Sequence, residues 1–92
     1  MTDVIVTIRI MPESPDTELA GVEKAARKEV VEFAGEQNMR TEIEPIAFGL
    51  SALKLTFATP EEKGSTDPLE EKLREIDGVA SAEVIDVRRA LG

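Results

Sequence analysis

Residues 50–59 read "LSALKLTFAT", and this stretch decides the fold. Large apolar side chains stand at every second position, whereas small or polar residues stand between them. A period of two is typical of a strand with one buried face. The stretch is therefore predicted to be a strand that places Leu53, Leu55 and Phe57 in the core. Its outer face is predicted to carry Ala52, Lys54, Thr56 and Ala58.

Three other stretches have the character of strands. Residues 39–47 alternate weakly, and Pro45 places this strand at an edge or a bulge, because proline cannot donate a backbone hydrogen bond. Residues 79–89, "VASAEVIDVRR", are rich in β-branched residues and are predicted to form the last strand. Residues 3–11 alternate as clearly as 50–59, and their core-facing set is predicted to be Val4, Val6, Ile8 and Ile10.

A first amphipathic helix is predicted over residues 17–36. Two prolines in "PESPD" interrupt the chain before it, and Asp16, or less favourably Ser14, is expected to serve as the N-cap. Apolar side chains then recur at helical spacing and share one stripe, which is expected to face the sheet. The stripe consists of Leu19, Val22, Ala26, Val30 and Phe33.

A second helix is predicted to begin after Asp67. This residue is the expected N-cap, with Pro68 in the first turn and Glu70 completing a capping box. Gly78 stands where a glycine would end the helix. The apolar positions that should face the sheet are Leu69, Leu73 and Ile76.

The predicted elements follow the order β-α-β-β-α-β, which divides into two similar halves. Each half can make a right-handed crossover, so the order fits the ferredoxin-like α+β sandwich, a four-stranded antiparallel sheet with two helices on one face. Ninety-two residues are enough for one core, and residues 1–92 are predicted to form a single domain. The open sheet face and the hairpin between the second and third strands are then the natural places for a partner.

The composition argues against several classes of function. The net charge of −8 repels phosphate backbones, so direct nucleic-acid binding is not expected. With no histidine and no cysteine, the chain lacks the usual zinc ligands and the thiol nucleophile. No apolar run approaches the roughly 18 residues of a membrane span, and Asp3 stands where a signal peptide has positive charge. We expect a cytoplasmic protein with no metal, cofactor or catalytic residue.

Binding motifs that accompany this topology elsewhere are missing from the chain. RNA-recognition domains stack bases on exposed aromatic residues of the central strands, whereas Phe57 is on the predicted inward face. The CxxC of metal chaperones is absent, and "KGST" at 63–66 resembles only the end of a phosphate-binding loop. Small regulatory ligand-binding domains have no signature that would exclude them.

Three segments together resemble a known family. They read "VTIRIMPESPDTEL", "EPIAFGLSALKL" and "GSTDPLEEKLREIDGVASAEVIDVRRAL". In this order they resemble the exchange-factor domain of translation elongation factor 1-beta in its short archaeal form, and "PIAFGL" is the most specific element. The resemblance implies a ferredoxin-like domain that binds the GTPase elongation factor 1-alpha and speeds the release of its GDP. It implies binding without covalent catalysis, so an enzyme is not expected.

The resemblance also implies two groups of partner-binding residues. In eukaryotic relatives an aromatic residue in the glycine-flanked turn inserts into the GTPase, and Phe48 matches it, together with Pro45, Ile46 and Gly49. A basic side chain near the C-terminus reaches toward the magnesium site of the GTPase. Arg88 and Arg89 lie near that position, with arginine where the family has lysine.

The residues alone leave other interpretations open. An aromatic residue beside a hairpin glycine can fold back over the end of the sheet, and arginines at a strand end can pair with nearby carboxylates. Three functions therefore remain: an exchange factor, a small-ligand-sensing regulatory domain, and an interaction module without exchange activity. The exchange factor is expected to be a monomer when free, whereas the sensor is expected to be a tight homodimer with a small molecule at its interface.

Overall fold

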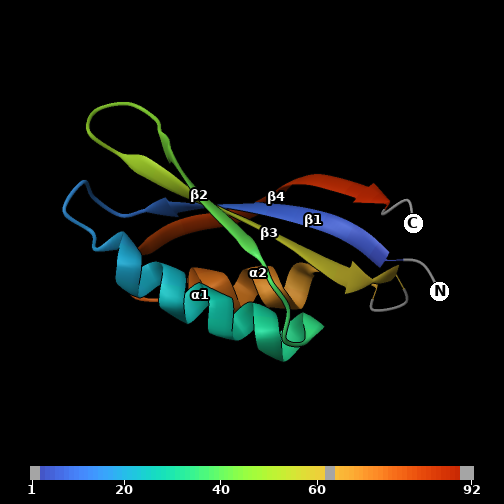
Figure 1. The fold of residues 1–92 in the computed structure, drawn as a ribbon. Coiled ribbons are helices and arrows are strands. Elements are labelled where there is room, and N and C mark those ends of the chain that lie inside the picture. The colour runs from blue at the N-terminus through green and yellow to red at the C-terminus, as the bar shows by residue number, and fades with distance from the viewer. Residues whose placement is uncertain (1–2, 62–63, 90–92) are drawn as a thin grey trace.

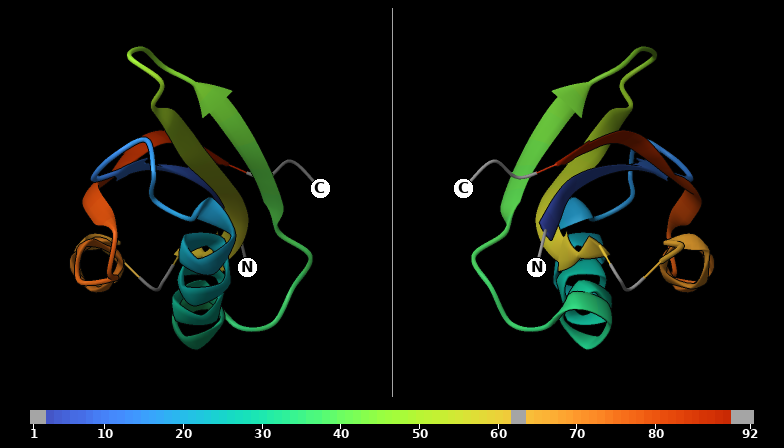
Figure 2. Two further views of the ribbon diagram at one scale, coloured as in Figure 1. Left: turned by 90° about the vertical axis from the view of Figure 1, so that its left-hand side faces the viewer. Right: turned by 90° about the vertical axis from the view of Figure 1, so that its right-hand side faces the viewer.

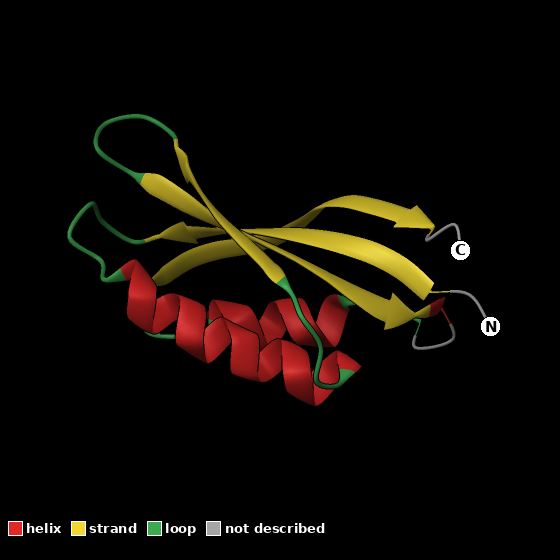
Figure 3. Cartoon of the chain, in the orientation of Figure 1, coloured by secondary structure: helices red, strands yellow, loops and turns green. Residues whose placement is uncertain are grey.

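The chain folds into one sheet covered on one side by two helices (Figure 1). The computed structural model describes residues 3–61 and 64–89. The sheet is antiparallel with the strand order β2-β3-β1-β4, so the predicted ferredoxin-like α+β fold is confirmed. Both helices lie on the same side of the sheet (Figure 3). The elements are β1 (Asp3–Pro12), α1 (Leu19–Ala34), β2 (Arg40–Pro45), β3 (Ser51–Pro60), α2 (Asp67–Arg74) and β4 (Val79–Arg89).

The core lies between the sheet and the helices and confirms the predicted inward faces of β1 and β3. Phe57 is 2% exposed, and Leu53 and Leu55 are fully buried. On the central strand β1, Ile8 lies opposite Leu55 of β3 and Val84 of β4. The remaining core residues are Val6, Ile10, Val22, Ala26, Val30, Leu69, Leu73, Val79 and Ala82.

The start of α1 differs from the prediction. The helix begins at Leu19, and its N-cap residue is Glu18, which makes no side-chain capping hydrogen bond. Ser14 and Asp16 belong to the preceding loop instead, where Asp16 N donates to Ser14 Oγ at 3.2 Å. Ser14 N in turn donates to Thr17 Oγ1 at 3.3 Å. These local bonds stabilise a turn, which is the conformation that competes with helix capping for such side chains.

The bounds of α2 also correct the sequence analysis. Asp67 is the first helical residue rather than the N-cap, a position taken by Thr66, whose hydroxyl donates to Glu70 Oε1 at 3.3 Å. Pro68 lies in the first turn, as predicted. The helix ends at Arg74, so Gly78 does not terminate it. Gly78 instead has a φ of +91° in the turn that leads into β4, a conformation that favours glycine.

The hairpin of β2 and β3 extends beyond the helix layer. β2 is an edge strand and pairs with β3 from Arg40 opposite Thr56 to Pro45 opposite Ser51. The views in Figure 2 show the hairpin rising away from α1 and α2, with its turn at the far end. This geometry leaves the turn free of the core and places it at one end of a molecule 42 Å long.

Candidate functional site

The turn of the β2–β3 hairpin has an unusual backbone. Leu50 N donates to Ala47 O at 2.9 Å, and Ile46 N donates to Leu50 O at the same distance. The two residues at its centre have positive φ angles, +55° at Phe48 and +78° at Gly49. Positive φ at both central positions is the pattern of a type I′ hairpin turn. Glycine adopts this conformation readily, whereas a bulky side chain does so rarely.

Phe48 combines a strained backbone with a fully exposed ring. Within residues 3–61 and 64–89 it is the only non-glycine residue with a positive φ. Its side chain is 95% exposed, so the ring does not fold back over the end of the sheet. A left-handed conformation costs a non-glycine residue about 1–3 kcal/mol, and such residues cluster at functional sites. Phe48 therefore neither relaxes the backbone of the turn nor contributes to the core.

Other apolar side chains continue the exposed surface around the turn. Ile46 is 45% exposed, and Ile43 on β2 is 57% exposed. The turn also approaches the loop between β1 and α1, because a Cβ atom built on Gly49 would lie 3.7 Å from Pro15 Cβ. The hairpin end is thus an exposed apolar surface with Phe48 at its tip, which has the character of an interaction surface.

The two predicted arginines lie at the end of β4 and point to different sides of the sheet. Arg88 lies opposite Ile5 on the open face and pairs with Asp86, with Nε 2.8 Å from Oδ2. Arg89 pairs with Glu61, with Nη2 2.9 Å from Oε1. All four side chains are at least 43% exposed. Both arginines thus have the carboxylate partners that the alternative interpretation describes, in pairs that water screens well.

The hairpin turn and the arginines do not form one site. Arg88 lies opposite Ile5, and Ile5 lies opposite Ala58 on β3. Ala58 is seven positions beyond Ser51, where the hairpin turn joins β3, and seven residues of strand span about 23 Å. The structure therefore places Pro45, Ile46, Phe48 and Gly49 at one end of the sheet, and Arg88 and Arg89 at the other (Figure 1).

The sequence model of the EF-1 guanine nucleotide exchange domain matches residues 5–90. The chain belongs to this family.

Archaeal relatives match the chain over almost its full length. The chain is 42% identical to elongation factor 1-beta of Methanothermobacter thermautotrophicus over 91 residues, which cover 99% of this chain and all of the relative. It is 44% identical to elongation factor 1-beta of Metallosphaera sedula, with 97% of each chain covered. Elongation factor 1-beta of Methanosarcina barkeri is 43% identical over 97% of this chain and 99% of its own. The family predicted from the three sequence segments is therefore confirmed.

Charge is divided unevenly between the strands and the rest of this family member. The four strands hold five acidic and five basic residues and are neutral as a group. The rest of the chain holds the other fourteen acidic and six basic residues, so it carries the whole net charge of −8. Within this remainder α1 holds three acidic and three basic residues and α2 holds three acidic and two basic residues, so a net charge of −7 lies outside both the helices and the strands. A partner surface that approaches the strands or the helices therefore meets less negative charge than one that approaches the segments between them.

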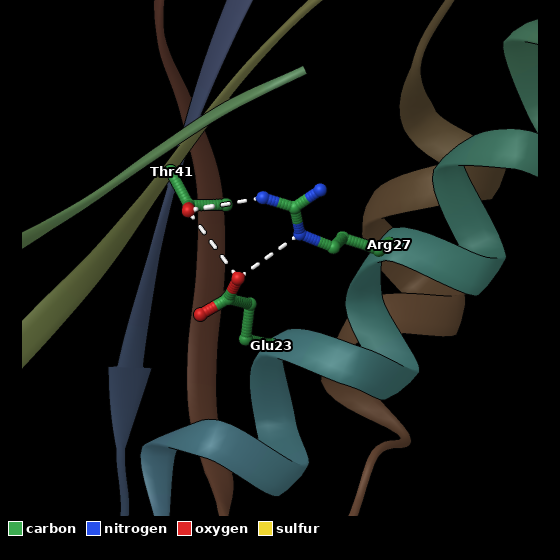
Figure 4. A network of polar contacts seen from close by, with 3 residues as sticks. All are labelled: Glu23, Arg27 and Thr41. Atoms are coloured by element: carbon green, nitrogen blue, oxygen red, sulfur yellow. Dashed lines mark hydrogen bonds and ion pairs between the residues drawn. The ribbon is translucent and has the colours of Figure 1, made fainter. Parts of the chain in front are cut away.

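A polar network that the sequence analysis missed ties β2 to α1 (Figure 4). Arg27 Nη2 donates to Thr41 Oγ1 at 3.1 Å, and Thr41 Oγ1 donates to Glu23 Oε2 at 3.3 Å. Arg27 Nε donates to the same Glu23 oxygen at 3.0 Å. The i,i+4 spacing of Glu23 and Arg27 is visible in the sequence, and it predicts a helical ion pair. Their contact with a strand residue depends on the tertiary structure.

The described surface has hollows but no cluster of metal ligands. No three histidine, cysteine, aspartate or glutamate residues in the described part of the chain gather as metal ligands. The hollows on the described surface include three of about 670, 500 and 380 Å³, which fall within the roughly 300–1,000 Å³ of typical ligand pockets. A smaller hollow of about 140 Å³ lies between the helices. It is lined by Glu29, Glu32, Phe33, Pro68, Leu69 and Lys72. Neither described helix is long and apolar enough to cross a membrane.

Proposed function

We propose that this protein promotes the exchange of GDP for GTP on elongation factor 1-alpha during translation elongation, with Phe48 as the residue that inserts into the GTPase. The observation that carries the proposal is the strained and 95% exposed Phe48 at the tip of the hairpin in a member of the exchange-domain family. Names of the archaeal relatives support the choice of partner.

The proposed mechanism needs differential binding and no covalent step. A factor that binds the nucleotide-free GTPase more tightly than the GDP complex lowers the barrier to GDP release. A thousandfold acceleration requires about 4 kcal/mol of such stabilisation. A buried aromatic anchor can supply about 2 kcal/mol or more of this, and an interface of ordinary size the remainder.

The basic end of β4 provides the second proposed contact. Arg89 is exposed, and its pair with Glu61 is of a kind worth about 0–1 kcal/mol, so releasing the guanidinium requires little energy. The same holds for Arg88 and Asp86. We therefore place one of these arginines near the magnesium site of the GTPase, where added positive charge would weaken metal binding and so GDP binding.

Release of fluorescent GDP from the cognate elongation factor 1-alpha tests the proposal directly. Catalytic amounts of the protein should raise the release rate without hydrolysing nucleotide. An unchanged rate at micromolar protein would refute the proposed function. The ligand-sensing alternative is tested in parallel, because stabilisation against heat by one member of an amino-acid panel would favour a sensor.

A further inference from the structure

The Glu23–Arg27–Thr41 network is the polar connection between the hairpin and the helix layer. Within the described ranges, Thr41 is the β2 residue whose side chain hydrogen-bonds to a helix. The other β2 side chains with described ion pairs, Arg40, Glu42 and Glu44, pair within β2 or with Lys54 of β3. The network therefore joins the sheet to the helix layer, whereas the other described ion pairs of β2 stay within the sheet.

Apolar packing holds the hairpin through β3, whose Leu53 and Leu55 are fully buried, but it contributes less at β2. Ile43 is the next residue of β2 on the same face as Thr41, opposite the buried Leu53, yet Ile43 is 57% exposed. Figure 2 shows that the hairpin rises away from both helices toward its turn. The buried side chains of β3 fix the inner strand of the hairpin, whereas the outer strand β2 is tied to α1 where Thr41 meets Glu23 and Arg27.

We propose that Thr41 is a positioning residue that, through Glu23 and Arg27, aims the hairpin so that Phe48 meets the GTPase in the correct orientation. The inference rests on the proposed exchange function. Thr41 lies five residues before Ile46, a strand length of about 17 Å, so a rotation of about 10° at Thr41 would move the turn by about 3 Å. In enzymes, a misplacement of 1 Å can reduce a rate about a hundredfold, so a shift of about 3 Å at the turn is large.

Thr41→Val tests the network, because valine keeps the shape of threonine and removes its hydroxyl. Thr66→Val is the matched control, since Thr66 Oγ1 donates to a glutamate oxygen at the same 3.3 Å distance but lies at the start of α2, away from the hairpin. The assay is the release of fluorescent GDP from elongation factor 1-alpha over a range of factor concentrations. We expect Thr41→Val to lower the exchange efficiency at least fivefold. Thr66→Val, and Thr41→Ser, which keeps the hydroxyl, should both stay within twofold of wild type.

A double substitution separates positioning from a general loss of structure. If Thr41 affects exchange by orienting the Phe48 ring, Thr41→Val should change the exchange rate by less than twofold in a Phe48→Ala background, where that ring is absent. Equal loss in both backgrounds would overturn the inference, and so would wild-type exchange by Thr41→Val. An inactive wild-type protein would instead refute the proposed function, and the inference with it.

Discussion

Replacing Phe48 should separate exchange from folding, because its ring is 95% exposed and buries almost no apolar surface in the free protein. Phe48→Ala should therefore change the free energy of unfolding by less than about 1 kcal/mol. Loss of an interface anchor typically costs about 2 kcal/mol or more of binding. We expect the exchange rate to fall at least about tenfold, which corresponds to about 1.4 kcal/mol.

The backbone of Phe48 gives a second and sharper variant. Its φ of +55° is unfavourable for phenylalanine and alanine but readily adopted by glycine. Relief of about 1–3 kcal/mol of strain outweighs or balances the roughly 0.5–1 kcal/mol of extra chain entropy that glycine loses on folding. Phe48→Gly should thus be at least as stable as the wild type, and yet as inactive in exchange as Phe48→Ala.

Urea unfolding and fluorescent GDP release measure the two effects separately, with Phe57→Ala as the control. Phe57 is 2% exposed, so its truncation should cost about 3–5 kcal/mol of stability. Unfolding of the domain by Phe48→Ala, with Phe57→Ala tolerated, would mean that the faces of the hairpin are assigned wrongly. Full exchange activity in both Phe48 variants would refute the insertion of the ring and shift the mechanism to Arg88, Arg89 and the open sheet face.

Three further outcomes are expected. Because this protein carries a net charge of −8, its association with a basic surface of the GTPase should slow as salt is raised from low concentration to about 0.1 M, where the screening length is about 10 Å. A flat salt dependence would assign the acidic surface to solubility alone. Arg89→Ala should change stability by less than about 1 kcal/mol, since the pair with Glu61 is exposed, and should reduce GDP release; normal release in both Arg89→Ala and Arg88→Ala would exclude a role for the basic end of β4. Gln37→Glu should cost about 1–3 kcal/mol in thermal or urea unfolding at pH 7, because the Gln37 amide donates to Ala58 O and accepts from Ala58 N, and a carboxylate cannot donate. That loss should shrink as the pH falls toward about 4, where a protonated carboxyl group donates again, and a pH-independent loss would contradict this explanation.

The fold could be predicted because strong hydrophobic alternation needs no tertiary information. Residues 79–89 were predicted as a strand with the bounds that β4 has, and the inward face of β3 follows from a period of two. The helix caps could not be predicted to the residue. Ser14 and Thr66 each bond to neighbours in the loop or the first turn, and several nearby polar residues could have served equally well.

The candidate site was only partly accessible from the sequence. The glycine in "PIAFGL" indicates a tight turn, but the type of turn decides whether Phe48 or only Gly49 takes a positive φ. The contact of Thr41 with α1 and the pairing of Gln37 with the edge of β3 join segments 14 to 21 residues apart. Such contacts depend on how the layers are stacked, which residue spacing along one element does not determine.

If both proposed contacts are made at once, the sheet between them has a role in exchange. About 23 Å of strand lies between the hairpin turn and the arginines, so neither contact can influence the other directly. Once the GTPase is bound at one end of the sheet, the second contact forms at a high effective concentration only if the distance and orientation between the two ends are fixed. β1 fixes both, because it pairs with both β3 and β4 and buries Val6, Ile8 and Ile10 against the helices. A more mobile sheet would lose conformational entropy on binding. This cost would reduce the extra stabilisation of the nucleotide-free GTPase on which the proposed GDP release depends.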